Sequence, residues 1–124
     1  MKKVYFIILS MFILHPFSAN CLPALSSYPS AKATIFLDFD GHYVQSTSWN
    51  GGTPFVCAPA PLNDAQITEI FNRVSEDYRP FNINITTDST KFLAAPLTQR
   101  IRIIVTPTSG WYLGVGGVSY TGSF

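Results

Sequence analysis

Two carboxylates and one imidazole fall at alternate positions of one short segment, Leu37 to His42. In an extended strand the side chains alternate between the two faces, so Asp38, Asp40 and His42 would point the same way. Carboxylate oxygens and an imidazole nitrogen on one face are a ligand set for a metal ion. A structural role fits the same residues, with both aspartates capping backbone groups at a strand end and Gly41 permitting a turn. Both interpretations stay open at this point.

The same segment resembles the nucleophile motif of haloacid-dehalogenase-type phosphatases, in which an apolar strand ends in Asp-x-Asp. That resemblance implies a phosphatase in which Asp38 attacks phosphorus and Asp40 is the general acid and base. The sequence departs from the pattern in two places. Gly41 follows the second aspartate where those enzymes usually carry threonine or valine, and Lys91 has only Asp88 near it in place of a later lysine and acidic pair.

Few other residues carry reactive groups. His42 is the only histidine outside the expected signal peptide, so a serine–histidine–aspartate triad finds no support. The glycines from Gly114 to Gly117 lack the spacing of a phosphate-binding fingerprint, and no helix signal follows them. The same loop carries Trp111 and Tyr112, which make it a candidate contact surface for a small binding module.

The charge balance excludes a polyanion-binding surface. Eight lysine and arginine residues oppose seven aspartate and glutamate residues, so the formal net charge is +1 and we expect no nucleic-acid partner. Charged residues make up 12% of the chain and hydrophobic residues 47%, a composition typical of a folded chain rather than a disordered one. A length of 124 residues allows one domain or part of one.

The first 21 residues have the pattern of a secretory signal peptide. Lys2 and Lys3 precede an apolar run from Val4 to Leu14, and small residues such as Ala19 follow near a candidate cleavage point. The apolar run is shorter than the roughly 20 residues that a membrane-spanning helix needs. We therefore predict a signal peptide over residues 1–21, with its cleavage point left open, and a secreted or periplasmic protein without a stable membrane span.

Cys21 and Cys57 are the only two cysteines. A lipid anchor at Cys21 is an alternative to simple cleavage, although Asn20 stands where such sites prefer a small residue. If Cys21 remains in the mature chain, the oxidising compartment would allow a disulfide with Cys57. If it does not, Cys57 is expected to be a small buried side chain.

Hydropathy and turn patterns predict an α/β fold over residues 33–124, preceded by a serine-, proline- and alanine-rich linker at 22–32. The clearest element is a helix that begins after Asn63 and ends near Tyr78, because Gln66 completes a capping box and Pro80 stops the helix. Its apolar side chains repeat at helical spacing and form one stripe.

Four strands are predicted, at residues 33–39, 81–86, 100–106 and 118–124. The second alternates strictly and would bury Phe81 with Ile83 and Ile85, while its Asn84 matches an N-glycosylation acceptor pattern. The third is apolar on both faces around Ile103, which predicts a central strand. Together the elements predict a small twisted mixed sheet backed by one amphipathic helix.

Five segments stand out as an ordered set: residues 35–42 (IFLDFDGH), 48–52 (SWNGG), 70–78 (IFNRVSEDY), 80–87 (PFNINITT) and 116–124 (GGVSYTGSF). In this order and spacing they resemble the N-terminal half of secreted bacterial zinc peptidases of the metzincin-like type. The resemblance extends from about Thr34 to Phe124 and implies the fold of the N-terminal subdomain of metzincin-type peptidases, a twisted sheet backed by a helix.

The resemblance also implies a later helix with the motif His-Glu-x-x-His-x-x-Gly-x-x-His. The three histidines of that motif would bind Zn²⁺, and its glutamate would be the general base for the metal-bound water. The chain contains no such motif, so no catalytic residue is carried over and we expect no tightly bound zinc in this chain. Val118 and Tyr120 would lie near the cleft and contact a peptide substrate by strand pairing.

The sequence therefore predicts an exported, non-catalytic N-terminal fragment of a zinc-peptidase-like protein, truncated before the metal-binding helix. The full-length parent would hydrolyse peptide bonds with a zinc-activated water, and this chain alone would be inactive. Its last predicted strand would leave an unpaired sheet edge, which suits part of a larger domain. The alternatives are a phosphatase that uses Asp38 and Asp40, and a small secreted binding module.

Overall fold

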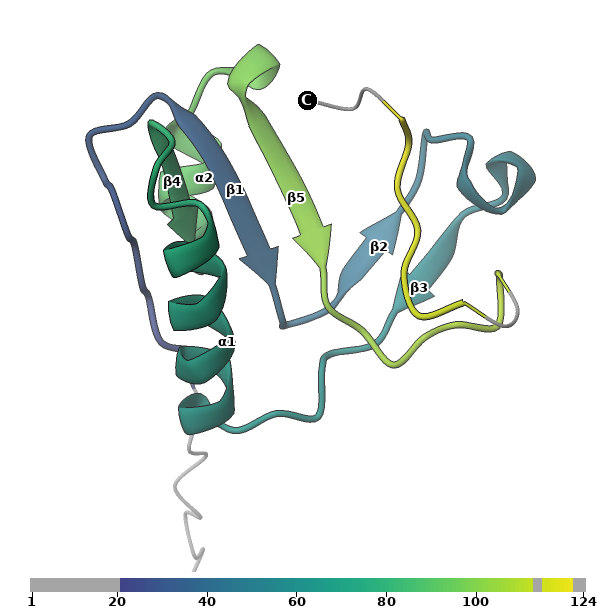
Figure 1. Cartoon of the computed structure of the whole chain (residues 1–124). Helices are drawn as coiled ribbons and strands as arrows, with labels where there is room; N and C mark the ends of the chain where they lie inside the picture. The colour runs from purple at the N-terminus through teal and green to yellow at the C-terminus, as the bar shows by residue number, and fades with distance from the viewer. Residues whose placement is uncertain (1–20, 113–114, 122–124) are drawn as a thin grey trace, which may run out of the picture.

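The computed structural model describes residues 21–112 and 115–121 and shows a small α/β fold (Figure 1). The expected signal peptide, apart from Cys21, lies outside the described residues. Three parallel strands form the main sheet in the order β4-β1-β5, with β1 at Ala33–Asp38, β4 at Ile83–Thr86 and β5 at Arg100–Ile104. The prediction of a mixed sheet is therefore wrong for these strands. Among the described residues the antiparallel pair of strands is a separate hairpin, β2 (His42–Val44) with β3 (Phe55–Cys57), and a single antiparallel bridge joins Ser26 to Thr86.

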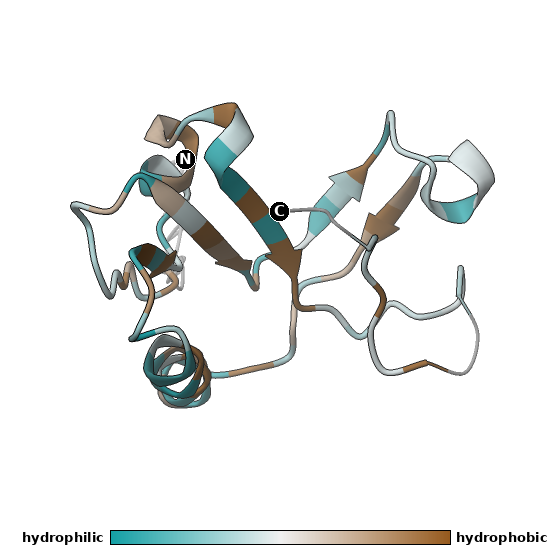
Figure 2. Cartoon of the chain, turned by 45° about the horizontal axis from the view of Figure 1, so that its top comes forward, coloured by the Kyte–Doolittle hydropathy of each residue, from teal (hydrophilic) through white to brown (hydrophobic). Residues whose placement is uncertain are grey.

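The central strand of the sheet is β1. Every side chain from Thr34 to Asp38 is buried, as expected for a parallel strand that is covered on both faces. The prediction that the strand near Ile103 would be central is wrong, because β5 lies at the edge of the sheet as described and Ile103 is exposed. Figure 2 shows the hydrophilic and hydrophobic bands that alternate along β5, because its arginine and isoleucine side chains point to opposite faces of the sheet.

Helix α1 (Asp64–Asp77) covers one face of the sheet (Figure 1). It begins where the sequence predicts, because the Asn63 side chain accepts a hydrogen bond from the Gln66 amide and the Gln66 side chain accepts one from the Asn63 amide, each at 3.0 Å. This capping box satisfies two amides that the first turn leaves free. The buried core lies between helix and sheet and consists of Ile35, Leu37, Phe39, Ile67, Phe71 and Ile85.

A second, shorter helix, α2 (Ser89–Ala94), covers the opposite face of the sheet, and a 3₁₀ turn (Leu97–Gln99) follows it. Phe92 of α2 stacks on Phe36 of β1 with ring centroids 5.1 Å apart. The guanidinium groups of Arg100 and Arg102 lie over the Phe92 ring, at 4.8 and 5.1 Å from its centroid. On this face of the sheet both arginines therefore make cation–π contacts with an aromatic ring, an arrangement that stabilises their charges.

Residues 22–28, part of the segment interpreted as a linker, run along the outer edge of β4. The Ser27 amide donates to the Ile85 carbonyl at 2.9 Å, and the Ile85 amide donates to the Ser27 hydroxyl at 3.0 Å. Thr86 is fully buried, and its hydroxyl bonds both the Leu25 carbonyl and the Ser26 hydroxyl. Side-chain hydroxyls thus complete an edge that backbone groups alone would leave open.

The docked segment changes the exposure expected for β4. Asn84 is buried and its side-chain oxygen accepts a hydrogen bond from the Tyr28 amide, so the glycosylation pattern lies on an inaccessible asparagine. Phe81, predicted on the buried face, is 58% exposed because the strand begins only at Ile83. The prediction of a half-buried strand is therefore wrong in two respects. Phe81 precedes the strand and is exposed, and the face that carries Asn84 is buried.

The hairpin of β2 and β3 lies beside β5, on the side away from β1, and residues 115–121 pass beside it (Figure 1). Its connection contains the turn Trp49–Gly52, in which Asn50 and Gly51 take left-handed backbone angles with φ of 53° and 63°. The strand expected at 118–124 is absent from residues 118–121, and residues 122–124 lie outside the described part. Cys21 is exposed, Cys57 is buried, and the two are not joined.

No helix among the described residues has the length and apolar character needed to cross a bilayer.

Candidate functional site

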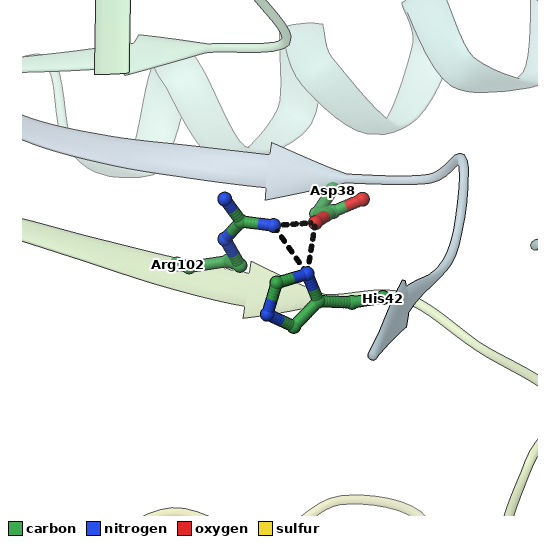
Figure 3. A network of polar contacts seen from close by, with 3 residues as sticks. All are labelled: Asp38, His42 and Arg102. Atoms are coloured by element: carbon green, nitrogen blue, oxygen red, sulfur yellow. Dashed lines mark hydrogen bonds and ion pairs between the residues drawn. The ribbon is translucent and has the colours of Figure 1, made fainter. Parts of the chain in front are cut away.

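The polar residues at the carboxyl end of β1 form a cluster of Asp38, His42 and Arg102 (Figure 3). Nη1 of Arg102 donates to Oδ2 of Asp38 at 2.7 Å and to Nδ1 of His42 at 2.6 Å. Each residue comes from a different strand, β1, β2 and β5, so the guanidinium joins the hairpin to the main sheet. The carboxyl ends of parallel strands are also where α/β folds place ligand sites.

A turn at Gly41 brings His42 back to Asp38. Gly41 has a φ of 89°, a left-handed conformation that favours glycine, and a Cβ atom there would lie 2.8 Å from the Cys57 carbonyl oxygen. The chain thus leaves β1 at Asp38 and re-enters as β2 at His42, and Asp40 is exposed on the turn between them. The expectation that all three residues share one strand face is wrong, because no single strand contains them.

Asp38 is buried, with 1% of its surface exposed, and Oδ1 has no hydrogen-bond partner among the described residues. The pKa of this carboxyl is raised to about 6, chiefly by burial and in addition by the neighbouring carboxyl of Asp40, whereas Arg102 opposes both effects. The geometry therefore leaves Asp38 close to the point at which it gains or loses its proton at mildly acidic pH.

His42 is neutral in this arrangement. Burial, followed by the charge of Arg102, lowers its pKa below the ordinary value. Because Arg102 is always a donor, Nδ1 of His42 must accept, and the ring proton resides on Nε2. The 3.9 Å separation between His42 Nδ1 and Asp38 Oδ2 is then a contact across the guanidinium and not an ion pair.

The cluster does not suit Zn²⁺. A divalent ion held by Asp38 and His42 would have to displace the Arg102 cation, which already bonds the atoms that would be its ligands. Asp40, the third predicted ligand, is exposed on the turn. Within residues 21–112 and 115–121, no three histidine, cysteine or acidic side chains are grouped to hold a metal ion.

The same burial disfavours Asp38 as the nucleophile of a phosphatase. A nucleophilic carboxylate must be ionised and open to in-line attack on phosphorus. Asp38 is shielded from solvent and its Oδ2 faces a guanidinium. Asp88, the only acidic residue near Lys91 in sequence, caps α2 by accepting from the Thr90 amide at 2.8 Å. The phosphatase interpretation stays a prediction that this geometry does not favour.

A second feature is an open hollow of about 600 Å³ beside the hairpin. Trp49 and Trp111 meet edge to face with centroids 5.5 Å apart, and Tyr120 stacks on Trp49 at 4.0 Å. The Tyr120 hydroxyl also lies 2.6 Å from the Ser48 hydroxyl. The aromatic hollow, as we call it, is lined by Ser48, Trp49, Asn50, Gly51, Trp111, Tyr112, Ser119 and Tyr120.

The predicted contact residues do not all lie in the aromatic hollow. Trp111, Tyr112 and Tyr120 come together in the aromatic hollow, and Val118 is exposed nearby in sequence but does not line it. The pairing of Val118 and Tyr120 with a peptide strand stays a prediction. Sequence reasoning did not connect these residues with Trp49, since its partner Tyr120 lies more than 70 residues later and no local pattern joins them.

Arg102 is the functional residue that sequence reasoning missed. Its signal was the alternation of arginine and isoleucine from Arg100 to Ile103, which places both arginines on one face of a strand. The pairing with Asp38 depends on the parallel register in which Phe36 lies opposite Arg102 and Asp38 opposite Ile104. That register cannot be derived from the pattern of either strand alone.

No family model matches the chain, and neither a curated protein nor a solved structure shows significant similarity to it.

Proposed function

We propose that the chain is the exported, non-catalytic N-terminal part of a zinc-dependent peptidase-like protein. In this proposal the sheet, α1 and the hairpin form a scaffold beside a peptide-binding cleft. The parent protein would hydrolyse peptide bonds with a zinc-activated water, held by a histidine-bearing helix that this chain does not contain.

The observation that carries the scaffold role is the pairing of Asp38 with Arg102. The segment Asp38 to His42 holds the residues best suited to chemistry, and its most buried carboxylate faces a fixed guanidinium rather than open solvent. Removal of one partner from a buried ion pair strongly destabilises a fold, because the other charge then stays buried without a counter-charge. The pair therefore holds the ends of the strands together. The cluster therefore acts as a structural clamp between β1, β2 and β5.

The architecture is compatible with the same proposal. The family resemblance implies a sheet backed by a helix, and the fold has a parallel sheet backed by α1. Residues 115–121, where the family would place sheet near its cleft, lie beside the hairpin with Val118 and Tyr120 exposed. Exposure of this kind is what contact with a peptide would require, and the contact itself stays a prediction.

Zinc titration and a protease assay test the proposal on the purified full-length chain. We expect no stoichiometric zinc binding by calorimetry and no hydrolysis of casein. The matched variants are Asp38→Asn and His42→Ala, which remove the predicted metal ligands one at a time. Casein cleavage by the wild-type chain, or tight zinc binding that both variants abolish, would contradict the scaffold role.

A genetic test addresses parentage separately from activity. The proposal expects that the reading frame of the parent gene encodes a His-Glu-x-x-His-x-x-Gly-x-x-His helix after the segment that ends in Gly122-Ser123-Phe124. Sequencing of transcripts through this region measures it directly. A transcript that carries no such helix would refute descent from a peptidase, while the structural role of the Asp38–Arg102 pair would stand.

A further inference from the structure

The aromatic hollow has a chemistry distinct from that of the Asp38 cluster. Its lining contains four aromatic rings, two hydroxyl side chains, one carboxamide and one glycine, and none of these described residues carries a charge. Both tryptophans of the chain lie in it. Its volume, about 600 Å³, falls within the range of roughly 300 to 1,000 Å³ that small-molecule sites occupy.

The uncharged lining selects among ligand classes. A phosphate or carboxylate ligand would need arginine or lysine, and a metal ion would need carboxylate or imidazole groups. A purely apolar ligand would displace water from the Ser119 hydroxyl and the Asn50 side-chain oxygen and offer them no hydrogen bond in return. The remaining class is a neutral molecule that offers apolar faces to the rings and hydroxyl groups to the rim.

A sugar ring has both properties. The C–H groups on one face of a pyranose are weakly positive and match the negative face of an aromatic ring, while its hydroxyls around the edge donate and accept hydrogen bonds. Tyr112 is 50% exposed and Tyr120 is 45% exposed, so each leaves ring surface for a ligand. We infer that the aromatic hollow binds a neutral saccharide, with a pyranose stacked on an exposed tyrosine ring and hydroxyls bonded to the polar side chains.

The walls of the hollow are held in place by contacts within the protein. Trp111 packs on Phe55 of β3 with centroids 4.7 Å apart, and Trp49 lies between Trp111 and Tyr120. The bond between the Ser48 and Tyr120 hydroxyls ties the segment after residue 115 to the hairpin. Rings fixed in this way lose little freedom when a ligand binds, which favours affinity from a small contact area.

Fluorescence and calorimetric titrations test the inference on the full-length chain. The probes are soluble oligosaccharides of glucose, xylose, mannose and N-acetylglucosamine, together with a proline-rich peptide, because aromatic grooves also bind such peptides. We expect at least one saccharide to change tryptophan emission and to give a saturable heat of binding. The peptide is expected to do neither.

Variants locate the binding site. Tyr112→Ala removes an exposed ring without opening the core, and Trp111→Ala removes an inner one; each should weaken saccharide binding by about tenfold or more. Phe81→Ala, which removes an exposed ring before β4, is the matched control and should bind as the wild type does. Absence of binding to every saccharide, binding unchanged in Tyr112→Ala, or binding of the peptide alone would each overturn the inference.

Discussion

Replacement of Asp38 by asparagine is the sharpest test of the clamp between the strand ends. Asparagine keeps the size of the side chain and an oxygen that accepts from Arg102, but it removes the titrating proton. The pKa of Asp38 is about 6 in the folded chain, against an ordinary value of 3.8 for an aspartate. The difference between these values corresponds to about 3 kcal/mol between the two protonation states.

The sign of the effect follows from the direction of that shift. Because burial raises the pKa, the stability contributed by neutral Asp38 is fully present below about pH 3.8 and is lost as the pH rises through about 6. The unfolded chain is already partly ionised at about pH 4, so about 2 kcal/mol of this stability is lost between about pH 4 and about pH 7.5. Over this interval Asp38→Asn should gain about that much stability relative to the wild type.

Urea unfolding of both proteins at a series of pH values, followed by far-ultraviolet circular dichroism, measures the difference. Asp77→Asn is the matched control, because it makes the same substitution at an exposed carboxylate at the end of α1. Parallel curves for Asp38→Asn would refute the reasoning. A relative loss of stability with rising pH would show that the charge of Arg102, and not burial, dominates the titration of Asp38.

Three further substitutions test other parts of the fold by the same unfolding assay. Gly41→Ala should destabilise the chain by about 1–3 kcal/mol, since an L-residue there is strained and its Cβ would meet the Cys57 carbonyl; unchanged stability would contradict the turn geometry. Asn63→Ala should cost about 1 kcal/mol and lower the helical signal, because the capping box is lost; an equal signal would argue against the cap. Thr86→Val should cost about 1–3 kcal/mol, because it removes the hydroxyl that bonds the Leu25 carbonyl and the Ser26 hydroxyl and accepts from the Asp88 amide; a neutral result would mean that residues 22–28 are not docked.

Local patterns were sufficient for the elements that carry their own signals. The capping residues at Asn63 and Gln66, together with Pro80, fixed the extent of α1 to within a residue or two. The apolar runs that became β1 and β5 were also recognised, because each is a continuous stretch of strand-forming residues.

Features that depend on distant partners were not predictable in the same way. The hairpin strands β2 and β3 have only three residues each and lie in stretches rich in polar residues and proline, so neither shows a period. The clamp required Arg102 to meet Asp38 across a parallel register, and the aromatic hollow required Tyr120 to meet Trp49 across a long interval of chain. Pairings of this kind are properties of the tertiary fold, and composition near either residue does not encode them.

The docked strip of residues 22–28 sets an order in which the parts of this chain can come together. Its bonding partners Thr86 and Thr87 lie some sixty residues later, so the strip has nothing to bind when it first leaves the ribosome. It must wait, extended and hydrated, until β4 has been made and has paired with β1. Docking of residues 22–28 therefore comes late in folding. An early proteolytic cut within this segment would remove the hydrogen bonds that cover the outer edge of β4.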